Sequence, residues 1–140
     1  MNLGYHSKYL IVHIGDGVVG MLDSNDILSV LSNPDNGEYA NYTYFTTCLD
    51  PKRVRLYGGY IKDLNGLVLM SDGVEESLYH YKTKSLVPVT KDIIKLLDDY
   101  SSSEVSSILE DNLKNVFALK SSDDLSIAIL RHHKNTIKEI

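Results

Sequence analysis

The sequence lacks tryptophan and has one cysteine, Cys48, among its 140 residues. A single cysteine excludes an internal disulfide, and it indicates a reducing compartment and an inert, buried thiol. The N-terminal residues lack the charged and apolar regions of a signal peptide, and no apolar run approaches the length of a membrane span. We therefore expect a cytoplasmic protein that does not enter a membrane.

Basic charge is also scarce. The 14 Lys and Arg residues are outnumbered by 19 Asp and Glu residues, which gives a formal net charge of −5. No basic patch is available to neutralise phosphates, so nucleic acid is not an expected partner. Hydrophobic residues make up 43% of the chain, as in globular proteins, and the length fits one domain over residues 1–140.

Short β-prone segments separated by turn residues fill the first half of the chain. The predicted strands are residues 9–14, 18–22, 27–31, 42–48, 54–61 and 67–70. This spacing is typical of a β-meander, and hairpin-linked strands imply an antiparallel sheet. Asn65-Gly66 is predicted to form a turn before the last of these strands.

The second half has helical periodicity. Apolar residues predict a helix over residues 89–100, with Pro88 at its start. Residues 101–104 are predicted to be a linker that ends in an N-cap, before a second helix through residue 114. Helices between β segments indicate the α+β class, in which helices pack on antiparallel sheet layers.

Residues 15–20 fit the pattern G-x-G-x-x-G, which in dinucleotide-binding folds opens a helix at the pyrophosphate. Here residues 23–26 (Asp-Ser-Asn-Asp) would fall inside that helix, although all four favour turns. We therefore interpret this segment as a hairpin.

Two acidic loops carry the strongest chemical signal. Ser71-Asp72-Gly73 follows an apolar strand, and Ser122-Asp123-Asp124 precedes another. Carboxylates at strand ends are the hard oxygen ligands that Mg²⁺ or Mn²⁺ prefers, although the same residues also form ordinary turns. Asp124 is expected to hydrogen-bond the loop as a structural neighbour.

The phrases around these loops resemble a known family. Residues 69–78 (LMSDGVEESL), 123–128 (DDLSIA) and 12–17 (VHIGDG) are similar, in this order, to motifs of the metal-dependent serine/threonine protein phosphatases (type 2C, or PPM-type). Residues 34–41 (PDNGEYAN) resemble a bacterial branch of that family. The chain resembles the C-terminal half of the phosphatase domain, which implies part of an αββα sandwich.

The resemblance implies roles for five residues. Asp72 and Asp123 would be direct metal ligands, with Gly73 completing the first motif. Asp16 would have a water-mediated or peripheral role, although an Asx turn that closes the strand explains it equally well. Glu76 would lie near an additional metal, one helical turn from Asp72, or would be a solvated surface acid.

Family members open with an Asp-Gly metal motif, an Arg that holds phosphate and a His proposed as general acid. Residues 1–8 supply no counterpart. The resemblance therefore implies a truncated phosphatase: the complete domain would hydrolyse phosphoserine or phosphothreonine in proteins with two Mg²⁺ or Mn²⁺ ions. The isolated chain would hold a weak, partial metal site and be inactive.

The alternative is a non-catalytic binding or regulatory module on the same scaffold. Both hypotheses leave sheet edges exposed, and both therefore predict a homodimer that pairs them.

Overall fold

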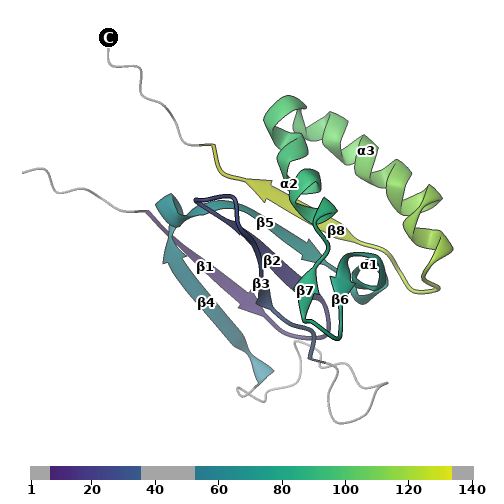
Figure 1. Cartoon of the computed structure of the whole chain (residues 1–140), viewed down its shortest axis with the longest axis horizontal. Coiled ribbons are helices and arrows are strands. Elements are labelled where there is room, and N and C mark those ends of the chain that lie inside the picture. Colours follow the sequence, from purple (N-terminus) through teal and green to yellow (C-terminus); the bar gives the residue numbers. More distant parts are fainter. Residues whose placement is uncertain (1–6, 36–52, 134–140) are drawn as a thin grey trace, which may run out of the picture.

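The computed structural model describes residues 7–35 and 53–133. The fold is α+β, with helices packed on antiparallel sheets, as the sequence predicted (Figure 1). The predicted strand at residues 42–48, and with it Cys48, lies outside the described residues. No helix in the described ranges is long and apolar enough to cross a membrane.

The central sheet has four strands in the order β3-β2-β5-β8, all antiparallel to their neighbours. Their bounds are β2 (Val18–Asp23), β3 (Leu28–Ser32), β5 (Leu64–Met70) and β8 (Ile127–Arg131). The register places Val18, Met70 and Ile127 side by side across the sheet. The two acidic loops adjoin β5 and β8, which are neighbours, so both loops lie at one end of the sheet.

The predicted turn at Asn65-Gly66 is wrong, because both residues lie inside β5. Gly66 is needed for packing rather than for a turn: a Cβ there would approach Ile94 Cγ2 to 2.5 Å. The glycine therefore lets helix α2 (Val89–Asp99) lie directly on the strand.

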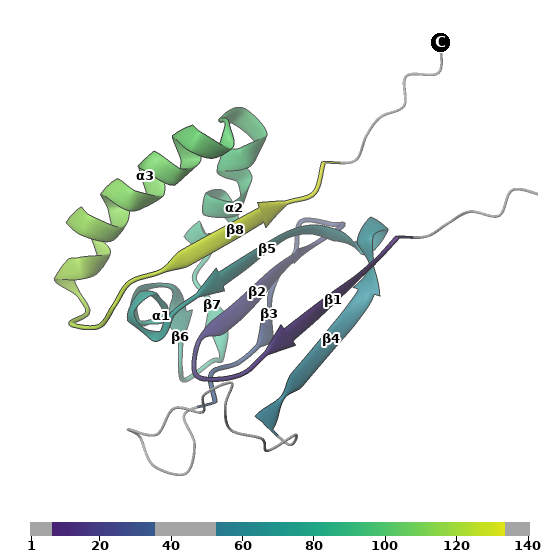
Figure 2. The same cartoon turned by 180° about the vertical axis from the view of Figure 1, so that it is seen from behind.

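A second, two-stranded sheet forms another layer. It pairs β1 (Lys8–His13) with β4 (Arg55–Tyr60) in antiparallel register. Contacts from β1 reach the central sheet: the Tyr9 hydroxyl donates to Met21 Sδ at 3.7 Å, and His13 Nδ1 is 2.8 Å from Ser32 Oγ. The small sheet therefore lies over the β2–β3 side of the central sheet (Figure 2).

The predicted β-meander and the hairpin predicted at residues 15–20 are both wrong about the strand that pairs with β1. β1 pairs with β4 and not with β2, so this connection joins two layers. Gly15, with φ of 104°, adopts the left-handed conformation that this corner requires. The segment after the corner is strand β2 and not a helix, which argues against the dinucleotide interpretation as expected.

Three helices cover the other face of the central sheet. They are α1 (Asp72–Leu78), α2 and α3 (Ser102–Asn115), and the short pair β6 (Tyr79–His80) and β7 (Ser85–Leu86) joins α1 to α2. Two 3₁₀ turns at Ile61–Asp63 and Phe117–Leu119 complete the described elements. The core lies between these helices and the sheet and includes Val18, Leu22, Val68, Met70, Val74, Leu78, Ile94 and Phe117.

The segment predicted as a linker belongs to α3. Ser101 is the N-cap, and its hydroxyl accepts a hydrogen bond from Glu104 N at 3.4 Å. The Glu104 carboxylate in turn accepts from Ser101 N at 2.9 Å. This capping box starts the helix at Ser102, three residues earlier than predicted.

One end of the central sheet, where β5 begins, holds an ion-pair network that we call the paired end. Lys95 Nζ and Asn65 Nδ2 donate to the two carboxylate oxygens of Asp26 at 2.8 and 2.9 Å. Arg131 donates to both carboxylate oxygens of Asp98 at 2.7 and 3.1 Å. The network ties the β2–β3 turn to α2 and β8.

Candidate functional site

The opposite end of the sheet, which we call the acidic end, brings the two acidic loops together. Ser71 N donates to Ser126 O, and Ser126 N donates to Ser71 Oγ, both at 3.0 Å. Ser71 Oγ donates to the carbonyl of Asp124, also at 3.0 Å. These bonds join segments more than 50 positions apart, and Asp124 does hydrogen-bond the loop, as expected, through its backbone.

Gly73 makes the approach of the two loops possible. A Cβ at this position would lie 2.7 Å from the carbonyl oxygen of Asp124 and 3.3 Å from that of Asp123. The first turn of α1 therefore packs directly on the backbone of the second loop. A glycine is required because a side chain would separate the two segments.

Asp72 begins α1, and its Oδ1 accepts a hydrogen bond from Gly73 N at 2.8 Å. Asp123 is an exposed residue of the facing loop. Within the described ranges, no three His, Cys, Asp or Glu side chains form a group that could hold a metal ion. The structure thus brings the two loops together, while metal binding by Asp72 and Asp123 stays a prediction.

The other two candidate ligands lie nearby. Asp16 is in the corner between β1 and β2, close enough for its charge to act on both His13 and Glu75. Glu76 is on the exposed side of α1. Their proposed metal roles, direct or peripheral, are also predictions that the structure does not test.

Glu75 is the residue that the sequence reasoning missed. It is 2% exposed, and its Oε1 accepts a hydrogen bond from the Tyr81 hydroxyl. Its Oε2 is buried without a partner among the described residues. Burial raises the pKa of Glu75 to about 7, and the negative charges of Asp72, Asp16 and Glu76 act in the same direction, against the bond from Tyr81.

A signal for this residue is present in the sequence. Val74 and Leu78 mark the buried face of α1, and position 75 lies three residues before Leu78, on the same face. The spacing of one helical turn from Asp72 instead predicted a role for the neighbouring residue Glu76.

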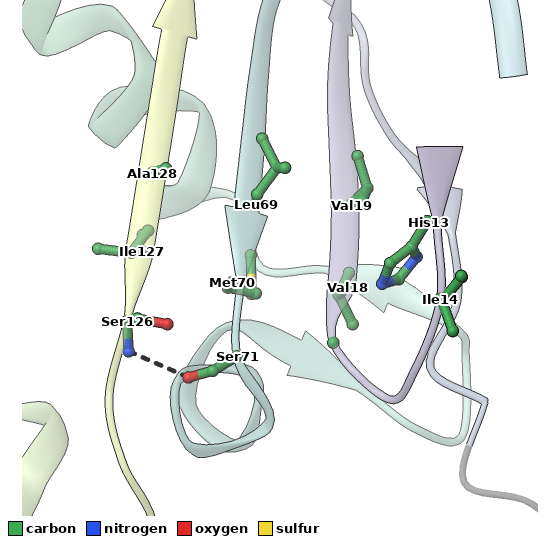
Figure 3. A pocket seen from close by; sticks show the side chains of 11 residues that line it. His13, Ile14, Val18, Val19, Leu69, Met70, Ser71, Ser126, Ile127 and Ala128 are labelled. Carbon is green, nitrogen blue, oxygen red and sulfur yellow. Dashed lines mark hydrogen bonds between the residues drawn. The ribbon is translucent and has the colours of Figure 1, made fainter. Parts of the chain in front are cut away.

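A hollow opens beside the acidic end, with a volume of about 360 Å³ (Figure 3). His13 lines it from β1, Val19 and Leu69 from the central sheet, and Ser71 and Ser126 from the joined loops. Figure 3 shows His13 on the side of the hollow opposite to the Ser71–Ser126 hydrogen bond.

His13 is held in place by a short chain of hydrogen bonds. The Tyr57 hydroxyl donates to Ser32 Oγ at 3.2 Å, and that oxygen is 2.8 Å from His13 Nδ1. Burial lowers the pKa of His13, and the charge of Arg55 lowers it further against the opposing charge of Asp16. The ring is therefore neutral near pH 7, which agrees with a structural role for this histidine.

The acidic end has the type of ligand that a hard divalent cation prefers, but it has too few of these ligands. Carboxylates are the ligand type that Mg²⁺ and Mn²⁺ prefer, and the Oε2 atom of Glu75 is buried here without a hydrogen-bond partner among the described residues. No described Lys or Arg forms an ion pair with Asp72, Glu75, Glu76, Asp123 or Asp124. The described carboxylates still fall short of a complete ligand set.

Comparison with known proteins decides the family. The model of the family described as Protein phosphatase 2C matches residues 5–117, well over half of the chain. This chain belongs to the protein phosphatase 2C family. The match includes the Asp16 and Asp72 segments and ends before Asp123. Neither the curated proteins nor the solved structures yielded a match to this chain.

Membership supports a phosphatase-like function and the assignment to hydrolases. Phosphatases of this family generally depend on Mg²⁺ or Mn²⁺.

Proposed function

We propose that this chain is the C-terminal portion of a bacterial-type, metal-dependent protein phosphatase and carries part of its metal site. The observation that supports this most directly is the junction of the two acidic loops through Ser71 and Gly73. Such a junction holds the backbones of the two rigid strand ends together, and Asp72 and Asp123 belong to these two segments. Asp72 and Asp123 are the proposed metal ligands, with Asp16 and Glu76 in supporting positions.

A bound Mg²⁺ or Mn²⁺ ion would supply an activated water and would neutralise charge on the phosphoryl oxygens. The substrate class that follows from the family is phosphoserine or phosphothreonine in a protein. The role of this chain's own residues is to hold the ion at the strand ends: Ser71 fixes the second loop, and Gly73 keeps the two loops in contact.

The isolated chain is proposed to be inactive and to bind metal weakly. Mg²⁺ requires close to six oxygen ligands in near-ideal octahedral geometry, and water has to supply those that protein carboxylates do not. Fewer than three candidate ligands converge within residues 7–35 and 53–133. Catalysis then requires further ligands from another polypeptide segment, in a longer or assembled form.

The alternative function is a non-catalytic binding or regulatory module on a phosphatase scaffold. The same shortage of converging ligands favours it. The two functions differ in one measurable property, because only the phosphatase portion needs a carboxylate-dependent affinity for metal. A cytoplasmic location is part of both proposals.

Calorimetric titration with Mn²⁺ tests the proposal. We expect weak binding that is lost in the double variant Asp72→Asn/Asp123→Asn and kept in Asp92→Asn, which removes an exposed carboxylate on α2 far from the loops. Circular dichroism shows that each variant is folded. Absence of binding by the folded wild-type chain would overturn the partial metal site and support the non-catalytic module.

A further inference from the structure

Helices α2 and α3 enclose a second hollow, which we call the helix hollow. The two helices meet at residues 100–101 and diverge from there, with α1 and the 3₁₀ turn at Phe117–Leu119 near their wide end (Figure 1). The space between these four elements has a volume of about 300 Å³. The residues that line it include Ser77, Leu78, Ile93, Leu96, Leu109 and Phe117.

The inner part of the helix hollow is apolar. Leu78, Leu109 and Phe117 are all buried, and Ile93 and Leu96 complete this surface from α2. Pockets for small molecules are concave and mostly apolar, and their volumes begin at roughly 300 Å³. The helix hollow therefore has the size and the lining of a site for one small ligand.

One buried hydroxyl in this lining has no partner. Ser77 comes from the last turn of α1, and its Oγ is buried without a hydrogen bond to any described residue. A buried polar atom without a partner is unfavourable, and most buried polar atoms in proteins are hydrogen-bonded. A ligand with a hydroxyl at its inner end would supply the missing hydrogen bond.

The rim of the helix hollow is exposed and carries a positive charge. Val89 and Val116 lie at the rim and are 50% and 46% exposed. Lys120 is exposed as well, and among the described residues that line the hollow it is the charged one. It forms no ion pair within the part of the chain that the structure describes. A ligand that reaches the rim therefore meets a cation, which favours an acidic outer group.

We propose that the helix hollow binds a hydroxyaryl carboxylic acid, a small molecule with an aromatic body, a hydroxyl at one end and a carboxylate at the other. The aromatic body packs on Leu78, Leu109 and Phe117, and Phe117 offers a ring for an edge or stacked contact. The hydroxyl bonds to Ser77 Oγ, and the carboxylate pairs with Lys120. Neutral apolar molecules satisfy neither polar group, so they should bind more weakly.

This site goes beyond the proposed function, and its contacts do not include the proposed metal ligands. Helix α1 nevertheless begins at Asp72 and ends beside the helix hollow. A ligand at Ser77 therefore contacts the helix that carries a proposed metal ligand. Binding can be measured in the presence of a chelator, which separates this inference from the metal site.

Titration with 3-(4-hydroxyphenyl)propanoate, followed by ¹H–¹⁵N NMR of the full chain in a chelator, tests the proposal. We expect a Kd on the order of 0.1–1 mM, because so small a ligand makes few contacts. The amide signals that shift should belong to α1, α2 and α3. Those of β1 and β4, which form a separate sheet, should stay in place.

Two variants and two analogues of the ligand separate the expected contacts. Ser77→Ala should weaken binding of the hydroxy acid about fivefold, because the hydrogen bond is lost. The analogue 3-phenylpropanoate, which lacks the hydroxyl, should bind equally to this variant and to the wild type. Lys120→Met should weaken both acids about threefold, as expected for an exposed ion pair. The uncharged 3-(4-hydroxyphenyl)propan-1-ol should not distinguish Lys120→Met from the wild type.

Lys114→Met is the matched control, since it removes an exposed lysine of α3 that does not line the helix hollow. It should leave every affinity unchanged, and the ¹H–¹⁵N spectrum shows whether each variant is folded. The proposal would be overturned by no binding of the hydroxy acid, by shifts outside the helix layer, or by an effect of the ligand hydroxyl that persists in Ser77→Ala.

A second copy of the chain is the other occupant to test, because the sequence predicts a homodimer. Light scattering measures the mass of the protein with and without the hydroxy acid. A dimer that the acid dissociates would show that the helix hollow is an interface between copies, which would overturn the choice of ligand. An unchanged mass together with binding that depends on Ser77 would support it.

Discussion

Carboxylate side chains have opposite surroundings at the two ends of the central sheet. At the paired end, Asp26 and Asp98 each face a Lys or Arg at 2.7 to 2.8 Å. At the acidic end, Glu75 is buried with one oxygen unpartnered, and neighbouring charges are negative. Arg53 and Arg55 also lie near the acidic end, where they bind Asp35 and the carbonyls of Asn33 and Gly15.

The difference appears in the pKa values. Hydrogen bonds from Lys95 and Asn65 lower the pKa of Asp26 to about 2, whereas burial and like charges raise that of Glu75 to about 7. The paired end therefore stabilises the fold as its carboxylates ionise. The acidic end does the reverse, and repulsion of this kind is concentrated at functional sites.

The largest expected effect is at the paired end. Arg131, whose side chain is 12% exposed, also donates to Asn65 O at 2.9 Å and lies 3.9 Å from Asp26, so Arg131→Ala removes contacts to α2, to β5 and to the β2–β3 turn at once. We expect it to lower the free energy of unfolding by about 2–3 kcal/mol in urea denaturation. Lys114→Ala removes an exposed pair with Glu110 and should have no measurable effect. Equal effects would mean that the paired end is not structural.

The next effect is at the acidic end and has the opposite sign. Glu75→Gln keeps the acceptor for Tyr81 and removes the charge, so it should stabilise the protein by about 2 kcal/mol at pH 8. The folded-state pKa of Glu75 is raised from 4.5 to about 7. The wild-type chain should therefore lose stability as pH rises from about 4.5 to 7, whereas Glu75→Gln should not.

The control for this prediction is the adjacent residue. Glu76 is exposed, so Glu76→Gln should leave the pH dependence between 4.5 and 7 in place. Identical pH profiles of the wild type and Glu75→Gln would show that Glu75 does not titrate in this range.

The smallest expected effect is that of Asp26→Asn at the paired end, and it depends on pH in the acidic range. Asp26 has a φ of 60°, which asparagine tolerates, so Asp26→Asn removes charge without straining the backbone. Because its folded-state pKa is lowered to about 2, its contribution is present above pH 3.8 and is lost as pH falls through 2. We expect Asp26→Asn to cost about 1 kcal/mol at pH 6, since the side chain is 31% exposed, and nothing near pH 2. Urea denaturation across this range would detect a constant difference if the prediction were wrong.

Local patterns fixed much of the fold. Strands β1, β2, β3, β4 and β5 and helices α2 and α3 have ends within three residues of those predicted. Turn clusters and helical apolar spacing depend on residues close together in the sequence, so they can be recognised without knowledge of the tertiary structure. The two acidic segments were also placed correctly at strand ends, although Asp72 and Gly73 begin helix α1 rather than lie in a loop.

The failures share a cause. A glycine can serve a turn or a close approach, and at Gly66 the contact with Ile94 decides for the latter. Likewise, a strand that is followed by a Gly-rich turn is expected to pair with the next strand in a hairpin. β1 instead pairs with β4, in a different sheet from β2. Partners distant in sequence settle these choices.

The sequence by itself determined the element types, the family motifs and the presence of acidic residues at two strand ends, because each depends on neighbours in the chain. Tertiary structure alone decided that Gly73 and Ser71 join the two loops, that Glu75 is buried while Glu76 is exposed, and that Asp26 and Asp98 at the opposite end are paired with Lys95 and Arg131. The physical reason is that burial and charge pairing depend on which surfaces meet, and pairing between β5 and β8 brings together residues more than 50 positions apart.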